Sequence, residues 1–212
     1  MMTTRALAKG AIVAALPVVL AACVTLLPKS QPAQLYRFGA NQPAPAQSAA
    51  PQTATRLFSV RLAPVTFERA SASDQILTVE GDRTAYIGGA RWVTSATSLF
   101  EAAVDQAFDV HKGGARLLAR GETTHADYAL KLDVRRFEAG YVNGQGAAPT
   151  ITVEVYAALG NLTDPTADRQ RTFRANVPAD DNRVGAIVRA FDKAIGSVLG
   201  DLATWTDAKG AG

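Results

Sequence analysis

The only thiol in this 212-residue chain is Cys23, and the residues before it have the order of an export signal. Arg5 and Lys9 lie in a short basic stretch, an apolar run from 11 to 20 follows, and two alanines precede the cysteine. The apolar run is too short to cross a bilayer comfortably, and small side chains at this place suit cleavage by a signal peptidase. Cys23 is therefore the residue whose type and position could do chemistry, namely alkylation of its sulfur.

The tetrad Leu20-Ala21-Ala22-Cys23 resembles the bacterial lipobox. This resemblance implies a diacylglyceryl thioether on Cys23, cleavage between Ala22 and Cys23, and acylation of the new amino terminus. The alternatives are an ordinary cleaved signal peptide, whose cysteine falls here by chance, and an uncleaved anchor. We favour lipidation because cysteine is absent from the rest of the chain.

Other residues that could do chemistry lie in patterns with structural explanations. His111 falls in the last turn of a predicted helix, where the helix dipole favours an imidazolium, and His125 falls in a polar turn. Neither belongs to an HExxH or a GxSxG motif. Asp180-Asp181 is typical of a helix cap, and Asp105 with Asp109 of a solvated helix face. We expect no enzyme activity and no catalytic residue, metal or cofactor.

Two further patterns could serve binding. Gly196 and Gly200 form a GxxxG motif, which we interpret as close packing of a helix on a sheet, with a subunit contact as the alternative. Arginines could place positive charge on an open sheet face or at its ends, which is usually a solvated face but could also meet an acidic partner or lipid headgroups. These arginines are Arg135, Arg136, Arg169, Arg171 and Arg174.

The composition allows one exported domain held together by packing alone. Removal of residues 1–22 leaves 190 residues, enough for a single core, and no cysteine pair exists for a disulfide. The formal net charge of +3 includes Arg5 and Lys9, so the mature chain carries about +1 in its side chains. Because the arginines are spread along the chain, no nucleic acid partner is expected.

Four regions follow from changes in composition. Residues 1–22 form the lipoprotein signal peptide, and 23–56 form a tether rich in Pro, Ala and Gln, with a short captured strand near 34–38. The folded domain spans 57–205, and 206–212 is predicted to be a flexible tail.

Hydrophobic periodicity predicts the elements of that domain. Apolar residues at helical spacing predict helices at about 97–110, with Ser98 and Glu101 as a capping box, and at about 182–203. Strict alternation over 128–134, and again in the two segments after it, predicts strands with one covered face. We therefore predict an α+β fold, with a single antiparallel sheet and two amphipathic helices packed on one face.

With these segments placed, the chain resembles the family of ABC-type transport auxiliary lipoproteins. The resemblance runs from about Gln34 to the last helix and depends on the order of its motifs more than on any one of them. After the lipobox these are Leu35-Tyr36-Arg37-Phe38, Val60-Arg61-Leu62-Ala63-Pro64, Phe67-Glu68-Arg69, Gln75-Ile76-Leu77, Arg91-Trp92 and Leu130-x-Leu132-x-Val134 with Arg136-Phe137. The chain departs from the family's usual Tyr-Leu-Asp-Arg at Thr66-Phe67-Glu68-Arg69, and Val93-Thr94-Ser95 replaces an acidic residue and a proline.

The resemblance implies a non-catalytic role beside an ABC transporter, with its permease and ATPase, and an MCE-domain substrate-binding protein that together move phospholipids between membranes. Val24, in place of an aspartate after Cys23, fits delivery to the outer membrane, on its periplasmic side. The resemblance also admits a homo-oligomer. The alternative function is a periplasmic lipoprotein for envelope assembly that has no link to lipid transport.

Overall fold

A computed structural model describes residues 32–39, 58–111, 113–164, 166 and 168–210. The strands in this part of the chain are β1 (Gln34–Tyr36), β2 (Phe58–Leu62), β3 (Thr66–Phe67), β4 (Gln75–Glu80), β5 (Arg83–Trp92), β6 (Ala115–Leu117), β7 (Tyr128–Gly140), β8 (Thr150–Asn161) and β9 (Arg169–Pro178). The helices are α1 (Ala96–Val110) and α2 (Val184–Gly210). No helix among these residues is long and apolar enough to span a bilayer. The predicted signal peptide and the predicted tether at 23–31 and 40–56 lie outside the described residues.

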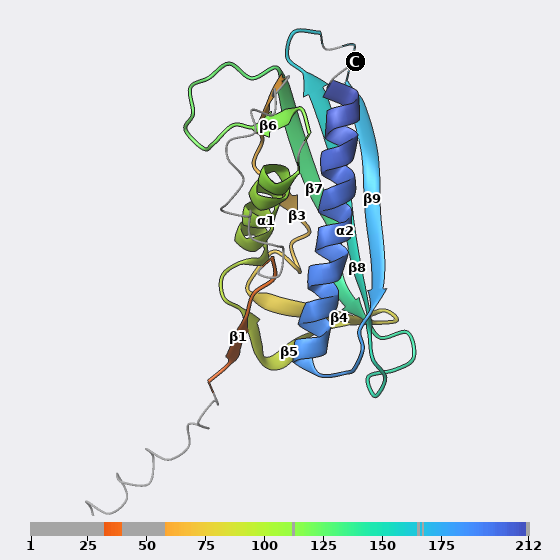
Figure 1. Cartoon of the computed structure of the whole chain (residues 1–212). Coiled ribbons are helices and arrows are strands. Elements are labelled where there is room, and N and C mark those ends of the chain that lie inside the picture. The colour runs from red at the N-terminus through yellow and green to blue at the C-terminus, as the bar shows by residue number, and fades with distance from the viewer. Residues whose placement is uncertain (1–31, 40–57, 112, 165, 167, 211–212) are drawn as a thin grey trace, which may run out of the picture. The chain divides into compact units, whose positions relative to one another are not determined.

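The long strand β7 organises the sheet. Along one edge it pairs with β8 in antiparallel register from Tyr128↔Asn161 to Gly140↔Thr150, and β8 pairs in turn with β9. Along its other edge three short strands, β2, β3 and β4, follow one another, and each runs parallel to it. One strand thus holds together two halves of the domain that are built from different parts of the sequence (Figure 1).

The prediction of α+β class is confirmed, but the predicted antiparallel sheet is wrong. The nine-stranded sheet is mixed, because β1 pairs parallel to β5 and β2 pairs parallel to both β6 and β7. Alternation of apolar and polar residues records which face of a strand is buried and carries no information on the direction of its neighbour. Direction is decided by where the chain crosses over, and α1 carries the chain across between β5 and β6.

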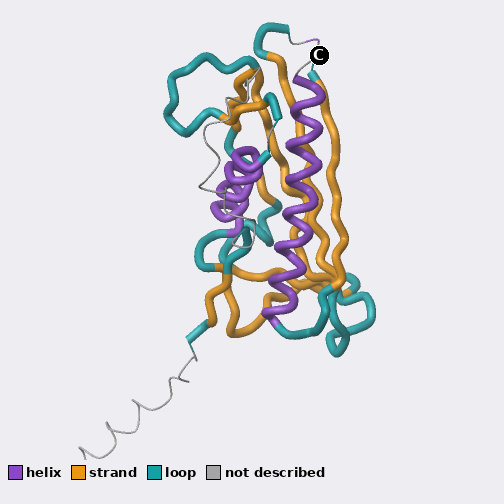
Figure 2. The backbone as a smooth tube through the Cα atoms, viewed as in Figure 1, coloured by secondary structure: helices purple, strands orange, loops and turns teal. Residues whose placement is uncertain are grey.

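Both helices lie on the same side of the long strands β7, β8 and β9 (Figures 1 and 2). α2 contacts β8 and β9 and also contacts α1. The side chains that β7 turns toward the helices are buried, including Leu130, Leu132 and Val134. A bulge at Arg135 then resets the alternation, so that Phe137 also points into the core.

The two helix boundaries differ from the predicted ones. Ser95, not Ser98, caps α1, since its side chain accepts a hydrogen bond from the Ser98 amide at 3.1 Å. α2 continues to Gly210, so the predicted frayed tail from 206 is wrong for the described residues. Trp205 and Thr206 are buried, and the Trp205 ring packs on Phe173 of β9 with a centroid separation of 5.7 Å. Burial of Trp205 and Thr206 stabilises the last turns of α2, whose other residues are small or polar and would not form a helix alone.

β1 occupies the place at which a captured strand was expected. Its three residues pair with residues 90–92 of β5, and the next turn of chain buries Phe38. The Phe38 ring meets Trp92 edge to face at 5.0 Å between centroids and meets Phe137 at 5.4 Å. The backbone amide of Gly39 then donates to Asp192 of α2 at 2.6 Å.

Candidate functional site

The candidate lipidation site, Cys23 with the cleavage position after Ala22, lies outside the described residues and remains a prediction. The structure instead shows how the described chain begins. Residues 34–36 form β1, which is fixed by pairing with residues 90–92 of β5.

His111 has a structural role. Its Nε2 is hydrogen-bonded to one carboxylate oxygen of Asp207, and the other oxygen accepts the backbone amide of Ala115 at 2.7 Å. Asp207 thus joins the end of α1 and the start of β6 to the last turn of α2. A Cβ on Gly113 would overlap the Asp207 carboxylate, so glycine is required there by the close approach.

His125 is not hydrogen-bonded to this clamp and lies instead beside Ser59 of β2. Its carbonyl accepts a hydrogen bond from Ser59 Oγ at 3.0 Å, and the same hydroxyl lies 2.9 Å from Asp127. The Ser59 amide and hydroxyl are the main causes that lower the pKa of Asp127. Serine contacts the carboxylate directly, without a histidine between them, which is not the order of a nucleophilic triad.

The arginines singled out in the sequence do not form one basic surface. Arg135, Arg136 and Arg174 lie on the sheet face turned away from the helices, where each forms an ion pair. Their partners are Asp133, Glu138 and Glu154, respectively. The charge of this open face is therefore largely compensated within the domain.

Arg171 lies on the opposite side of β9. Its guanidinium stacks at 5.0 Å over the ring of Phe173, which is buried against α2. Arg169, two residues earlier, is on the same side by alternation and is exposed. Three of the five arginines therefore lie on the open face and Arg169 lies at an end of the sheet, as expected, whereas Arg171 lies on the side that the helices cover.

The interpretation of Gly196 and Gly200 as packing residues is wrong. A Cβ at either position would meet no atom within 4 Å, so neither glycine permits a close approach of α2 to the sheet. Both lie on the outer surface of α2, beside exposed Ser197 and Asp201. The alternative, a contact with another subunit, remains a prediction.

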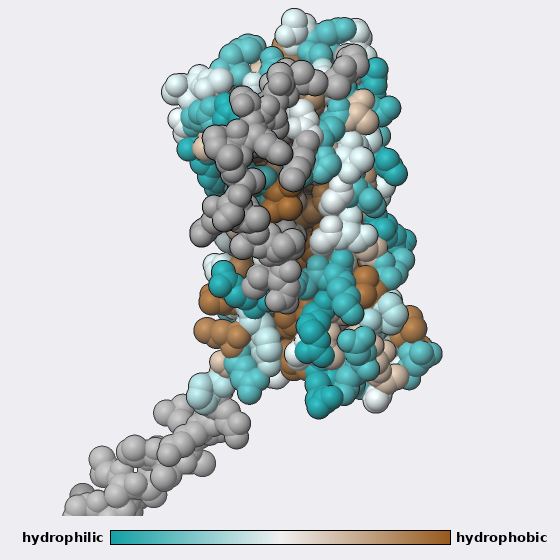
Figure 3. Space-filling view, viewed as in Figure 1, coloured by the Kyte–Doolittle hydropathy of each residue, from teal (hydrophilic) through white to brown (hydrophobic). Residues whose placement is uncertain are grey.

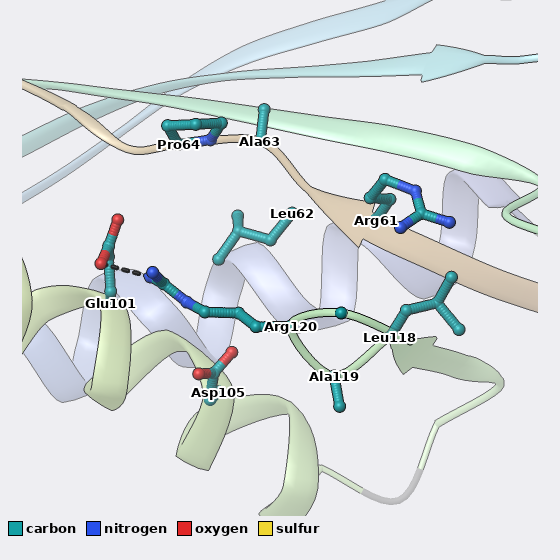
Figure 4. A pocket seen from close by; sticks show the side chains of 10 residues that line it. Arg61, Leu62, Ala63, Pro64, Glu101, Asp105, Leu118, Ala119 and Arg120 are labelled. Atoms are coloured by element: carbon teal, nitrogen blue, oxygen red, sulfur yellow. Dashed lines mark hydrogen bonds and ion pairs between the residues drawn. The ribbon is translucent and has the colours of Figure 1, made fainter. Parts of the chain in front are cut away.

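A cleft that no motif indicated lies between α1 and the end of β2 (Figure 4). It has a volume of about 270 Å³ and is formed by three segments: α1 with Glu101 and Asp105, residues 61–64, and residues 118–121. Neither histidine lines it. The sequence did not predict the cleft because its walls come from segments far apart in the chain. Of its lining residues, only Asp105 belongs to a sequence pattern that could do chemistry, through its spacing from Asp109.

Charges within the cleft mainly hold its walls in place. Arg120 is paired with Glu101, and Arg61 donates to the carbonyl of Thr124 at 2.9 Å. Burial raises the pKa of Asp105, and the neighbouring Asp109 and Glu101 raise it further, while Arg120 lowers it. No cluster of metal-ligating side chains occurs among the described residues. The cleft has the character of a polar surface pocket, with no nucleophile and base in contact.

The segment 118–121 is itself fixed by Glu122. Its carboxylate binds Arg116 through two hydrogen bonds, at 2.6 and 3.0 Å, and accepts the Ala119 amide at 3.0 Å. These bonds, first of all the one from Arg116, lower the pKa of Glu122 from 4.5 to about 2. Glu122 is therefore ionised in the folded domain at neutral pH.

Comparison with known families decides the relationship. The model of the ABC-type transport auxiliary lipoprotein component family matches residues 40–203. The chain belongs to this family. The predicted resemblance is thus confirmed, and with it the coarse role of an auxiliary lipoprotein of transport.

Solved structures agree with the family assignment. Protein XCC0632 from Xanthomonas campestris, of family DUF330, is 26% identical over 84% of this chain and 94% of its own, with a TM-score of 0.66. A second structure, described as an uncharacterized protein, shares the fold at 9% identity, with 82% and 99% of the two chains covered and a TM-score of 0.62. Comparison with curated proteins gave no match.

The Asp207 clamp predicts a loss of stability on mutation. Asp207→Ala leaves His111 and the Ala115 amide without their acceptor, and we expect the free energy of unfolding to fall by about 1–3 kcal/mol. Urea denaturation followed by circular dichroism measures this change. Asp201→Ala, at an exposed position of the same helix, is the matched control and should change the free energy by less than about 0.5 kcal/mol. Equal effects of the two substitutions would contradict the clamp.

Glu122 predicts a dependence of stability on pH. Because its pKa in the folded chain is about 2, below the ordinary 4.5, its contribution is complete above pH 4.5 and is lost as the pH falls toward 2. Glu122→Gln should therefore lose less stability over this interval than the parent chain does. Thermal unfolding at several pH values measures the difference. Asp82→Asn, in an exposed turn, should retain the parent's slope, and a Glu122→Gln slope equal to the parent's would refute the prediction.

Proposed function

We propose that this protein is a lipid-anchored, non-catalytic component of an MCE-type ABC transporter that moves phospholipids between membranes. It would be held on the periplasmic side of the outer membrane by the lipid on Cys23. The family match over residues 40–203 is the observation that carries this proposal. The lipobox tetrad and the residue Val24 support the anchor and its placement.

The structure supports a role in binding rather than in chemistry. His111 is engaged with Asp207, and Ser59 with Asp127. In the part of the chain that the structure describes, the cleft brings no nucleophile to a general base. Among the described residues, His111 and Ser59 are thus engaged in holding the fold.

Two surfaces are suited to neighbouring proteins. β9 pairs only with β8 among the described strands, so its outer edge, ten residues long, presents free backbone groups to a partner. On α2, Gly196 and Gly200 lie on the outer face and would allow a helix of another subunit to approach closely. We propose these surfaces for contact with the MCE-domain protein, with the permease and ATPase complex behind it, and for assembly of copies into a homo-oligomer.

The anchor is tested by Cys23→Ala. We expect the parent chain to float with membranes in a density gradient and the variant to appear in the soluble periplasmic fraction, since one protein domain without acyl chains has no comparable hold on a bilayer. Mass spectrometry of the mature amino terminus shows whether Cys23 carries lipid. A Cys23→Ala chain that stays with the membrane as before would overturn the lipid anchor.

The partner is tested by purification from detergent extracts of the native host. We expect an MCE-domain protein to be recovered with the tagged lipoprotein, and a substitution in the free edge of β9, Thr172→Pro, to reduce the recovery because proline blocks pairing of an edge strand. Thr123→Ala, in an exposed turn that belongs to neither proposed surface, is the control. Recovery of envelope-assembly proteins without any transporter component would favour the alternative function instead.

A further inference from the structure

The end of the domain that follows the tether carries an exposed patch made by two neighbouring strands. Leu35 of β1 lies beside Arg91 of β5 in the register, and the Val93 amide donates to the Tyr36 carbonyl at 2.7 Å. Alternation therefore places Leu35, Arg37, Arg91 and Val93 on one face, and all four are exposed. We call these four residues the β1–β5 patch.

Its apolar members are unusually open to solvent. Leu35 is 62% exposed and Val93 is 52% exposed, whereas Phe38 and Trp92 on the reverse side are buried. Figure 3 shows hydrophobic side chains gathered on the surface at the end of the domain where β1 lies. Because the reverse side is fixed in the core, the patch is presented rigidly.

The two arginines of the patch differ in whether a carboxylate is paired with them. Arg91 binds both oxygens of Asp74 at 3.0 Å and is neutralised by it. Arg37 has no hydrogen bond or ion pair to the described part of the chain, in contrast to the paired arginines of the open sheet face. The patch therefore combines two aliphatic side chains with one uncompensated guanidinium.

We propose that the β1–β5 patch rests on the surface of the phospholipid bilayer to which the chain is anchored, with Leu35 and Val93 in the headgroup region and Arg37 on lipid phosphates. The proposal rests on the anchor at Cys23 proposed above. Leu35 follows Cys23 by twelve positions in the sequence, so the tether holds the patch within about 40 Å of the membrane even when fully extended.

The chemistry and size of the patch favour a bilayer over a protein. Aliphatic side chains beside an arginine match the boundary of acyl chains and phosphates, where guanidinium forms paired hydrogen bonds to phosphate oxygens. A stable protein interface needs roughly 20–30 residues on each side, far more than these four. A weak contact with lipid is sufficient to keep the patch on the bilayer, because the tether holds the patch close to the membrane and so gives it a high effective concentration there.

Fluorescence quenching tests the contact in the lipidated chain. Leu35→Cys places the only free thiol on the patch, since the Cys23 sulfur is then a thioether. The labelled chain is reconstituted in vesicles of phosphatidylethanolamine and phosphatidylglycerol that contain doxyl-labelled lipid. We expect quenching at least about twofold stronger than for a label at Leu162→Cys, because shallow insertion brings only the patch to the quencher. Leu162 is 53% exposed at the other end of β8 and is the matched control, and Val93→Cys provides a second site on the patch.

Arg37→Gln tests the electrostatic part. One basic residue at an anionic surface contributes a factor of about five to the contact equilibrium, so the variant should show correspondingly less quenching and a weaker response to salt. Arg189→Gln, at an exposed position of α2, should behave as the parent chain does. Equal behaviour of both variants would overturn the role of Arg37.

The possible failures are distinguishable. If the chain floats with the vesicles but labels at the patch and at Leu162 are quenched equally, the bilayer contact is wrong and the anchor stands. If labels at Leu35 transfer energy between chains in detergent without vesicles, the patch is a subunit contact and the bilayer proposal is overturned. If the chain does not float and Cys23 has a free thiol, the anchor itself is wrong and the proposal falls with it.

Discussion

The burial of Phe38 against Trp92 and Phe137 is the interaction that fixes the start of the described chain to the rest of the domain. It joins β1 to strands that lie beyond a stretch of 18 residues in the sequence, 40–57. Closing a loop of that length costs roughly 2.5 kcal/mol in chain entropy beyond a constant. Burying a phenylalanine contributes about 1.5–3 kcal/mol, and each ring contact adds about 0.5–1.5 kcal/mol. The aromatic contacts are thus large enough to hold β1 in place.

The rings of Trp92 and Phe137 also connect β1 to the interior of the domain. Trp92 packs on Phe191 of α2 at 5.4 Å, and Phe137 of β7 lies 4.8 Å from the same ring. β1 is therefore attached to the central strand and to the long helix through side chains as well as through its three backbone pairs. This attachment is what the proposed membrane tether needs from so short a strand.

Prediction from sequence is most accurate where a pattern of residues depends on a single structural property. Alternation over Tyr128 to Val134 located the covered face of β7, because side-chain direction has a period of two in any strand. Strand direction, by contrast, depends on which segments return beside β7, and no residue of β2 or β4 records it. The end of α2 was missed because Trp205 is held by Phe173, a contact between distant segments.

The same reasoning explains the candidate sites. Cys23 could be singled out because a peptidase reads a contiguous stretch of sequence, so its recognition motif is linear. The cleft beside Asp105 and the pairing of the sheet arginines depend on neighbours across strands, which a linear pattern does not contain. Side-chain type alone suggested a positive open face, and Asp133, Glu138 and Glu154 cancel it.

Charge compensation then separates two kinds of surface on the molecule. Where Arg135 and Arg174 meet carboxylates on the sheet, desolvation on binding would disrupt existing pairs, so that face offers little gain to a charged partner. Arg37 has no such pair among the described residues, and it lies on the same face as exposed Leu35. An uncompensated charge and an open apolar side chain therefore occur together near the start of the described chain, the arrangement that suits the proposed contact with an anionic membrane.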